Sequence, residues 1–147
     1  MRIGLVIPTL NAGDSFAALL QSCRRQTCQL QRCLVVDSAS VDGTASLARE
    51  AGFEVWKIAR SAFNHGRTRQ QALERLAADV DIVIFLTQDV QLYDYNGFSS
   101  LVAAFADGKV AAAYGRQLPF PGATLDARLS REFNYPSKGR VKSLRDR

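Results

Sequence analysis

Short apolar runs alternate with amphipathic segments along most of the chain. Runs typical of buried strands occupy residues 2–7, 32–36, 53–58, 81–87 and 110–114. Between them, apolar residues recur every three or four positions, which predicts helices over 14–27, 42–52, 66–78 and 95–107. A last helix-like stretch covers 125–133, after a loop rich in Pro and Gly. This alternation predicts an α/β fold, a Rossmann-like and mostly parallel sheet with helices on both faces.

Individual side chains refine this prediction. Asp14 precedes the first helix and is expected to cap it, because a carboxylate accepts from free N–H groups there. Trp56 and Tyr114 are expected to be core or partly buried aromatics rather than exposed stacking platforms.

Polar residues follow three of the predicted strands directly. Pro8, Thr9 and Asn11 follow the first, the segment 37–44 (DSASVDGT) follows the second, and Gln88 and Asp89 follow the fourth. Each group taken singly is also explained by turn and cap chemistry, above all the Asp42-Gly43-Thr44 sequence. Three such groups in one sheet favour a binding edge, because ligands of parallel sheets bind beyond the carboxyl ends of the strands.

The chemistry of these strand ends favours a nucleoside diphosphate held by side chains. No GxGxxG sequence follows the first strand, where Gly13 is the only glycine, so a nicotinamide dinucleotide site is disfavoured. An Asp after the second strand can accept from a pyrimidine N–H. An Asp after the fourth can hold a divalent cation that bridges two phosphates and stabilises the departing diphosphate.

Four sequences in order carry a family resemblance: IPTLNAG, VVDSASVDGT, FNHGRTRQQAL and FLTQDV. They are similar to the successive signatures of family 2 glycosyltransferases, which have the GT-A nucleotide-diphospho-sugar transferase fold. The FNHG and TQD sequences, with the later GRQLPFPGA and REFNYP, resemble the rhamnosyltransferase branch. The resemblance runs from Arg2 to about Pro136. It implies inverting, metal-assisted transfer of a hexosyl group, with a rhamnosyl group favoured, to an acceptor hydroxyl.

The resemblance implies a role for each polar strand end. Residues implied to bind the nucleotide sugar are Pro8, Thr9, Asn11, Asp37, Ser40, Asp42, Arg67, Gln88 and Asp89. Asp37 is implied to hydrogen-bond the base, while Ser40 and Asp42 shape the base and ribose contacts. Either Arg67 or Arg69 is implied to approach the diphosphate. Two roles are open for His65, a phosphate contact or a local structural role. Two are also open for Arg116, a contact with the donor sugar or diphosphate or a surface salt bridge.

The metal-binding motif departs from the family pattern. Thr87-Gln88-Asp89 stands where the family has DxD, so the first Asp is replaced and Asp89 is the surviving ligand. Mg²⁺ or Mn²⁺ is the implied cofactor, bound more weakly than by two carboxylates. The implied donor is dTDP-rhamnose, with a UDP-sugar as the alternative, and the implied acceptor is a glycan or a lipid-linked glycan.

The resemblance places the general base beyond the last residue of this sequence. We therefore expect residues 1–136 to form an incomplete, C-terminally truncated donor-binding domain, followed by a basic tail at 137–147. Enzymatic activity stays open, and the alternative is a non-catalytic domain that only binds a nucleotide sugar. The face left uncovered by such truncation is expected to be partly apolar, which predicts self-association.

Composition restricts the cellular compartment and the kinds of cysteine site that are expected. The chain has 147 residues, 47% of them hydrophobic and 22% charged, and no apolar run approaches the ~20 residues of a membrane span. No signal peptide is recognisable, so the cytoplasm is expected, with peripheral attachment at the inner face of the membrane left open. Three cysteines and one histidine without paired spacing argue against a disulfide framework or a zinc site.

Positive charge is concentrated at the C-terminal end. Five basic residues and one acidic residue lie between Lys138 and Arg147, and they account for most of the net charge of +5. A solvated tail explains this concentration, and an anionic lipid surface is the alternative. The rest of the chain has no basic face interleaved with aromatics, so a nucleic-acid partner is not expected.

Overall fold

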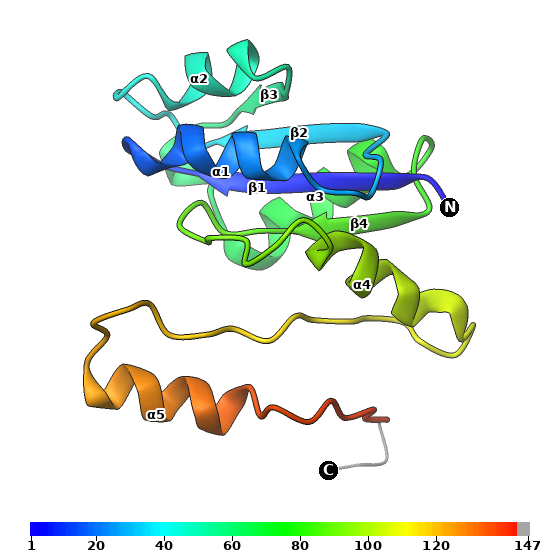
Figure 1. The fold of residues 1–147 in the computed structure, drawn as a ribbon. Helices are drawn as coiled ribbons and strands as arrows, with labels where there is room; N and C mark the ends of the chain where they lie inside the picture. The colour runs from blue at the N-terminus through cyan, green and yellow to red at the C-terminus, as the bar shows by residue number, and fades with distance from the viewer. Residues whose placement is uncertain (144–147) are drawn as a thin grey trace.

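The computed structural model describes residues 1–143. The chain forms a four-stranded sheet in the order β3-β2-β1-β4, and each neighbouring pair is parallel. The strands are β1 (Ile3–Thr9), β2 (Arg32–Asp37), β3 (Glu54–Lys57) and β4 (Ile82–Phe85). The helices are α1 (Ser15–Arg24), α2 (Thr44–Glu50), α3 (His65–Leu76), α4 (Gly97–Ala103) and α5 (Leu125–Asn134). Two 3₁₀ turns, η1 (Arg60–Ala62) and η2 (Ala104–Ala106), complete the elements of the described chain (Figure 1).

Helices cover both faces of the sheet, as the sequence predicts. On one face, Leu5 and Ile7 of β1 pack with Phe16 and Leu20 of α1 and with Phe98 of α4. On the other, β1 and β2 pack against α3, and this cluster is Val6, Leu34, Val36, Ala72, Leu76 and Val80. Successive residues of β1 thus enter opposite cores, which is why the strand is apolar without alternation.

Gly4 has a packing reason on the α3 face. A methyl group there would lie 3.2 Å from Leu76 Cδ1 and 3.3 Å from the Val80 methyls. The missing side chain lets α3 and the segment after it approach β1 closely.

The register brings the polar strand ends to one edge. Thr9 of β1 is paired with Asp37 of β2, and Val6 of β1 with Phe85 of β4. The carboxyl ends of β1, β2 and β4 therefore lie together, and the segments that follow them can interact.

The prediction of a fifth strand at 110–114 is wrong. This segment is extended, but it forms no ladder with the four strands of the described sheet, and none of its residues is buried. A strand-like sequence becomes a strand only when a neighbour accepts its backbone hydrogen bonds, and β4 does not do so here. Tyr114, expected in or near the core, is 72% exposed, whereas Trp56 is half-buried as expected.

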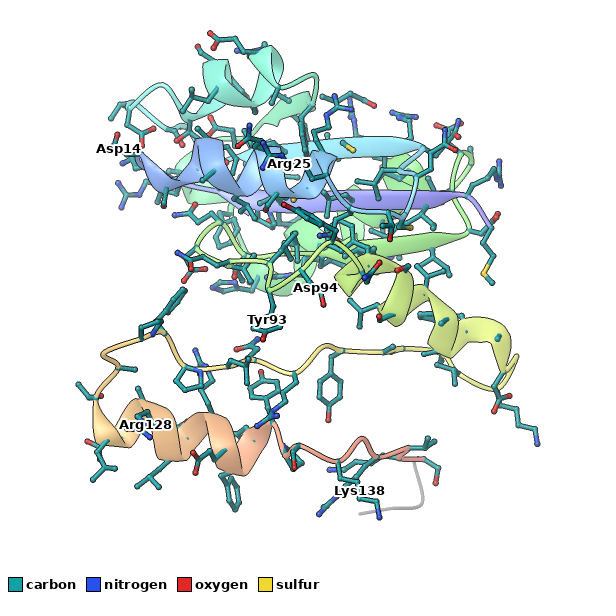
Figure 2. All side chains as sticks on the ribbon, viewed as in Figure 1. Asp14, Arg25, Tyr93, Asp94, Arg128 and Lys138 are labelled. Atoms are coloured by element: carbon teal, nitrogen blue, oxygen red, sulfur yellow. The ribbon has the colours of Figure 1, made fainter. Side chains whose placement is uncertain are left out.

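The end of the described chain lies apart from the sheet. Residues 108–124 and α5 run beside the domain rather than over it (Figure 1). Arg128 and Lys138 both lie on this outlying part, on the far side from Arg25 of α1 (Figure 2). None of the residues 107–143 is buried. The predicted tail at 137–147 falls partly outside the described residues, since 144–147 are not described. In the described part, no helix is long and apolar enough to cross a membrane.

Candidate functional site

The loop after β1 is held by side chains from the two other strand ends. Four consecutive backbone N–H groups, those of residues 10–13, each donate to a side-chain oxygen. In order along the loop, the acceptors are Gln88 at 2.7 Å, Ser40 at 2.9 Å, Thr44 at 2.9 Å and Asp42 at 3.0 Å. Leu10 and Ala12 are half-buried, and backbone groups shielded from water need such partners. The four partners lie 29 to 78 residues away along the chain.

Asn11 completes the tie to the loop after β2. Its side-chain oxygen accepts from the backbone N–H of Val41 at 2.9 Å, while its own N–H donates to Ser40. Asn11 has φ 47° and Ala39 has φ 62°, both in the left-handed region that side chains with a Cβ disfavour. Backbone strain of this kind persists where surrounding contacts enforce it, and it clusters at ligand sites.

Asp37 lies beneath this loop pair. Its carboxylate accepts from the Thr9 hydroxyl at 3.3 Å and from the backbone N–H of Ser40 at 3.2 Å. The side chain is fully buried. For Asp37 to accept a hydrogen bond from a base, as the resemblance implies, its carboxylate must first become exposed.

Asp42 serves both the β1 loop and α2. One oxygen accepts from the N–H and the hydroxyl of Thr44, the first residue of α2, and the other accepts from the Gly13 N–H. The Thr44 hydroxyl bond, with the backbone bonds from Gly13 and Thr44, holds the pKa of Asp42 below its ordinary value. The local turn interpretation of this sequence is supported by the Asp42–Thr44 bonds, but the N-cap of α2 is Gly43 and no side chain caps this helix. Asp14 precedes α1 but its side chain makes no cap hydrogen bond, so that expectation is wrong.

Gln88 and Asp89 are adjacent in sequence but differ in hydrogen bonding. Gln88 makes two hydrogen bonds to the backbone of Leu10, whereas Asp89 is exposed and has no hydrogen-bond or ion-pair partner among residues 1–143. Asp89 is thus a free carboxylate beside an otherwise saturated loop. It is an oxygen ligand of the kind that Mg²⁺ and Mn²⁺ accept.

The described residues offer one carboxylate to such a cation rather than a complete site. Residues 1–143 contain no group of three or more His, Cys, Asp or Glu that could hold a metal ion. Both amide atoms of Gln88 are committed to Leu10. Asp89 therefore fits a cation whose other ligands are phosphate oxygens and water, the usual situation of Mg²⁺ bound with a nucleotide.

The start of α3 holds the cationic candidates. Asn64 caps the helix by accepting from the N–H groups of Gly66 and Arg67. The Arg67 side chain is exposed and has no ion-pair or hydrogen-bond partner in the described chain. Arg69 donates to the His65 carbonyl oxygen at 3.0 Å and lies 3.4 Å from its Nδ1. Of the two arginines, Arg67 is therefore the one with a free guanidinium. His65 makes a local contact with Arg69, in agreement with the structural role that was one of its two alternatives.

Arg116 does not lie in this network. Its guanidinium donates to the backbone oxygen of Tyr135 at 3.2 Å, within the outlying C-terminal part. The structure thus brings together Thr9, Asn11, Asp37, Ser40, Asp42 and Gln88. Pro8 adjoins Thr9 in β1, while the side chains of Asp89 and Arg67 have no hydrogen-bond or ion-pair partner among residues 1–143. Thr44 was missed as a site residue, although its place after Asp42 and Gly43 was the available signal.

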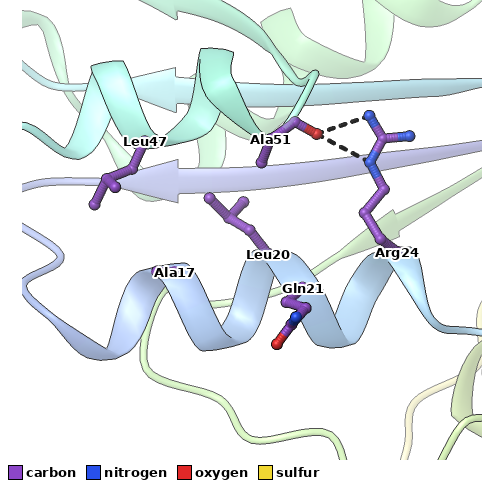
Figure 3. A pocket seen from close by; sticks show the side chains of 6 residues that line it. All are labelled: Ala17, Leu20, Gln21, Arg24, Leu47 and Ala51. Atoms are coloured by element: carbon purple, nitrogen blue, oxygen red, sulfur yellow. Dashed lines mark hydrogen bonds between the residues drawn. The ribbon is translucent and has the colours of Figure 1, made fainter.

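A surface depression between α1 and α2 is separate from these strand ends. It has a volume of about 250 Å³ and is lined by Ala17, Leu20, Gln21, Arg24, Leu47 and Ala51 (Figure 3). The Arg24 guanidinium there donates to the backbone oxygens of Ala51 and Gly52. The Nε and Nη2 donors of Arg24 are thus engaged, and the lining of the depression is mostly apolar, so the depression is the seam between two packed helices.

The fold is that of GT-A glycosyltransferases. A glucosyl-3-phosphoglycerate synthase of Mycobacterium tuberculosis, solved with Mn²⁺, UDP and glucosyl-3-phosphoglycerate, superposes with a TM-score of 0.60 at 22% identity. The match covers 74% of this chain and 40% of that one. A mannosyltransferase of Pyrobaculum calidifontis, solved with GDP-mannose and Mn²⁺, gives 0.61 at 23% identity over 74% of this chain and 33% of its own. At these identities the likeness establishes the fold.

The chain belongs to glycosyl transferase family 2, whose sequence pattern matches residues 5–146. An O-antigen chain rhamnosyltransferase of Salmonella typhimurium is 42% identical over 99% of this chain and 46% of its own length. Another, from Salmonella anatum, is 37% identical over 97% of this chain and 45% of its own. The chain therefore spans slightly less than half the length of these curated relatives.

Proposed function

We propose that this chain binds the nucleoside diphosphate of a sugar donor at the carboxyl edge of its sheet. The observation that carries the proposal is the loop network itself. Side chains from three strand ends hold one edge of the sheet. Asp89, directly after Gln88, keeps a free carboxylate, and Arg67, in the first turn of α3, keeps a free guanidinium. A diphosphate bridged by a divalent cation matches this pair of charges.

Each part of the edge has a role in this proposal. Pro8, Thr9 and Asn11 line the nucleotide pocket, and Ser40 and Asp42 hold its wall at the base and ribose. Asp37 supports the wall through its hydrogen bonds with Thr9 and Ser40, and accepts from the base once its carboxylate is exposed.

Arg67 and Asp89 act on the diphosphate. Arg67 neutralises it, Gln88 keeps the neighbouring loop in place, and Asp89 holds Mg²⁺ or Mn²⁺. When bound, that cation supplies stabilisation of the negative charge that develops on the departing diphosphate.

The proposed reaction is transfer of a hexosyl group, with rhamnosyl favoured. The two relatives from Salmonella are O-antigen chain rhamnosyltransferases, which supports dTDP-rhamnose as donor, with a UDP-sugar as alternative. The proposed acceptor is a hydroxyl of a glycan or lipid-linked glycan in polysaccharide biosynthesis. The cytoplasm, or the inner face of its membrane, is the proposed location.

Donor binding and sugar transfer are separate claims here, because the chain aligns with less than half of each relative. Transfer needs a general base for the acceptor hydroxyl, and we assign that role to no residue of this sequence. The second candidate is therefore a domain that binds the nucleotide sugar without turnover.

Calorimetric titration tests the donor site directly. We expect dTDP or UDP to bind with Mn²⁺, and Asp89→Asn to weaken binding by about tenfold or more, the scale usual for disturbing a metal site. Asp126→Asn, an equal charge change on α5, is the matched control and is expected to change nothing. A folded chain that binds neither nucleotide contradicts the proposal. Binding of dTDP-rhamnose without release of free sugar or transfer to added glycan favours the second candidate.

A further inference from the structure

The outlying helix α5 has an apolar stripe that nothing in the described chain covers. Leu125, Leu129 and Phe133 follow one another at four-residue spacing and are 68%, 54% and 87% exposed. At about 100° per residue, the three side chains lie within an arc of about 80°. Three exposed apolar residues in one stripe form a contiguous patch, the kind of exposure that marks interaction sites, rather than scattered exposure.

The helix is specified locally, so the stripe is a definite surface. Thr124 caps it by accepting from the Ala127 N–H, Asp126 lies in its first turn and Arg131 in its last turn. These placements suit the helix dipole at each end.

The charges beside the stripe are arranged for self-pairing. Arg128 and Glu132 lie on the same flank, and neither forms an ion pair with a described residue. Two copies of α5 packed antiparallel, with Leu129 at the two-fold axis, place Leu125 of one copy opposite Phe133 of the other. In that arrangement equivalent flanks face each other, so Arg128 of each copy lies on the same side of the dimer as Glu132 of its mate, about 3 Å along the axis from the position directly opposite.

We propose that α5 is a homodimer interface, in which a second copy of this chain pairs antiparallel through Leu125, Leu129 and Phe133. Two Arg128–Glu132 ion pairs per dimer set the orientation. A helix that buries its apolar stripe against lipid does not need an Arg and a Glu on the same flank, whereas an antiparallel pair of identical helices uses both. Lipid-facing helices favour basic residues at the edges of the stripe, whereas the acidic side chains of Asp126 and Glu132 flank this one.

Sedimentation velocity over a range of protein concentrations tests the dimer. We expect concentration-dependent dimerisation in the micromolar range or above, because the interface is small. Leu129→Lys puts two like charges at the axis and is expected to leave only monomer. The chain remaining monomeric at all concentrations, or Leu129→Lys leaving the dimer intact, overturns the proposal.

Charge exchange tests the orientation. Arg128→Glu and Glu132→Arg are each expected to weaken dimerisation by about tenfold, because two attractive pairs per dimer become repulsive. Combining them restores the pairs with reversed signs and is expected to return the affinity to within about twofold. Arg131→Glu makes the same charge change on the opposite side of α5 and is the matched control. Equal effects of Arg131→Glu and Arg128→Glu, or no recovery in the double variant, overturn the proposal.

A disulfide between position 129 of the two copies tests whether Leu129 lies at the two-fold axis. Oxidation of the Leu129→Cys variant is expected to give a disulfide-linked dimer. Because Cys28 and Cys33 are only partly buried, the unmodified chain is oxidised in parallel. Far-UV circular dichroism of each variant shows that the fold is retained, which is expected because α5 makes no part of the sheet core. Monomer that instead sediments with anionic vesicles assigns the stripe to lipid and overturns the dimer.

Discussion

Gln88 and Leu10 are joined by a reciprocal pair of hydrogen bonds. The Leu10 N–H donates to the Gln88 side-chain oxygen at 2.7 Å, and the Gln88 amide N–H donates back to the Leu10 carbonyl at 3.1 Å. The pairing of β1 with β4 ends at Val6 and Phe85, and beyond it the Gln88 side chain supplies the hydrogen bonds that a neighbouring strand would give to the backbone of Leu10. Gln88 therefore has a structural task, distinct from the cation-binding role that we propose for Asp89.

Removing this amide is expected to destabilise the fold. Gln88→Ala leaves the N–H and the carbonyl of Leu10 without their partner, and the free energy of unfolding should fall by about 1–3 kcal/mol. Gln88→Glu should also destabilise, because its carboxylate has no donor for the Leu10 carbonyl. Urea denaturation measures both. Thr87→Ala, a neighbouring exposed side chain, should change the value by less than about 0.5 kcal/mol.

The left-handed backbone of Ala39 predicts a stabilising substitution. At φ 62° its Cβ is strained, so Ala39→Gly is expected to raise the free energy of unfolding by about 1 kcal/mol. The same change at Ala18, in the middle of α1, should lower it by about 1 kcal/mol. Equal signs for the two variants in thermal or urea unfolding would show that position 39 is unstrained.

Asp42 should make the free energy of unfolding depend on pH, because its carboxylate joins the loops after β1 and β2. Its pKa is depressed in the folded state, so its contribution to stability is present above the ordinary carboxyl pKa and is lost as pH falls through the folded value. The destabilisation by Asp42→Ala should therefore be largest near neutral pH and shrink below about pH 4. Chemical denaturation at several pH values measures this dependence. Asp14→Ala, whose carboxylate makes no cap bond, is the control.

Gly4 should not tolerate a side chain. The added methyl of Gly4→Ala would press on Leu76 and Val80, and the free energy of unfolding should fall by about 1–3 kcal/mol. Gly108→Ala places its methyl in open space and should be near neutral. A neutral Gly4→Ala in differential scanning calorimetry would mean that α3 moves away without cost.

Local pattern determined the α/β character of this chain. The apolar run of β1 indicated a strand buried on both faces, and the four strands and the helices between them lie where periodicity places them, within a few residues. Polar residues directly after β1, β2 and β4 indicated a shared binding edge, because parallel strands end on the same side. These are properties of neighbouring residues and of strand direction, which a sequence carries by itself.

Tertiary structure alone decided what those polar residues do. The N–H groups of the β1 loop are satisfied by Ser40, Thr44, Asp42 and Gln88, and Asp37 is buried under them while Asp89 is left free. It also decided that 110–114 remains extended without pairing and that Tyr114 stays exposed. Burial and hydrogen bonding depend on which distant segments meet, and those partners, up to 78 residues apart, are set by the packed sheet and not by local sequence.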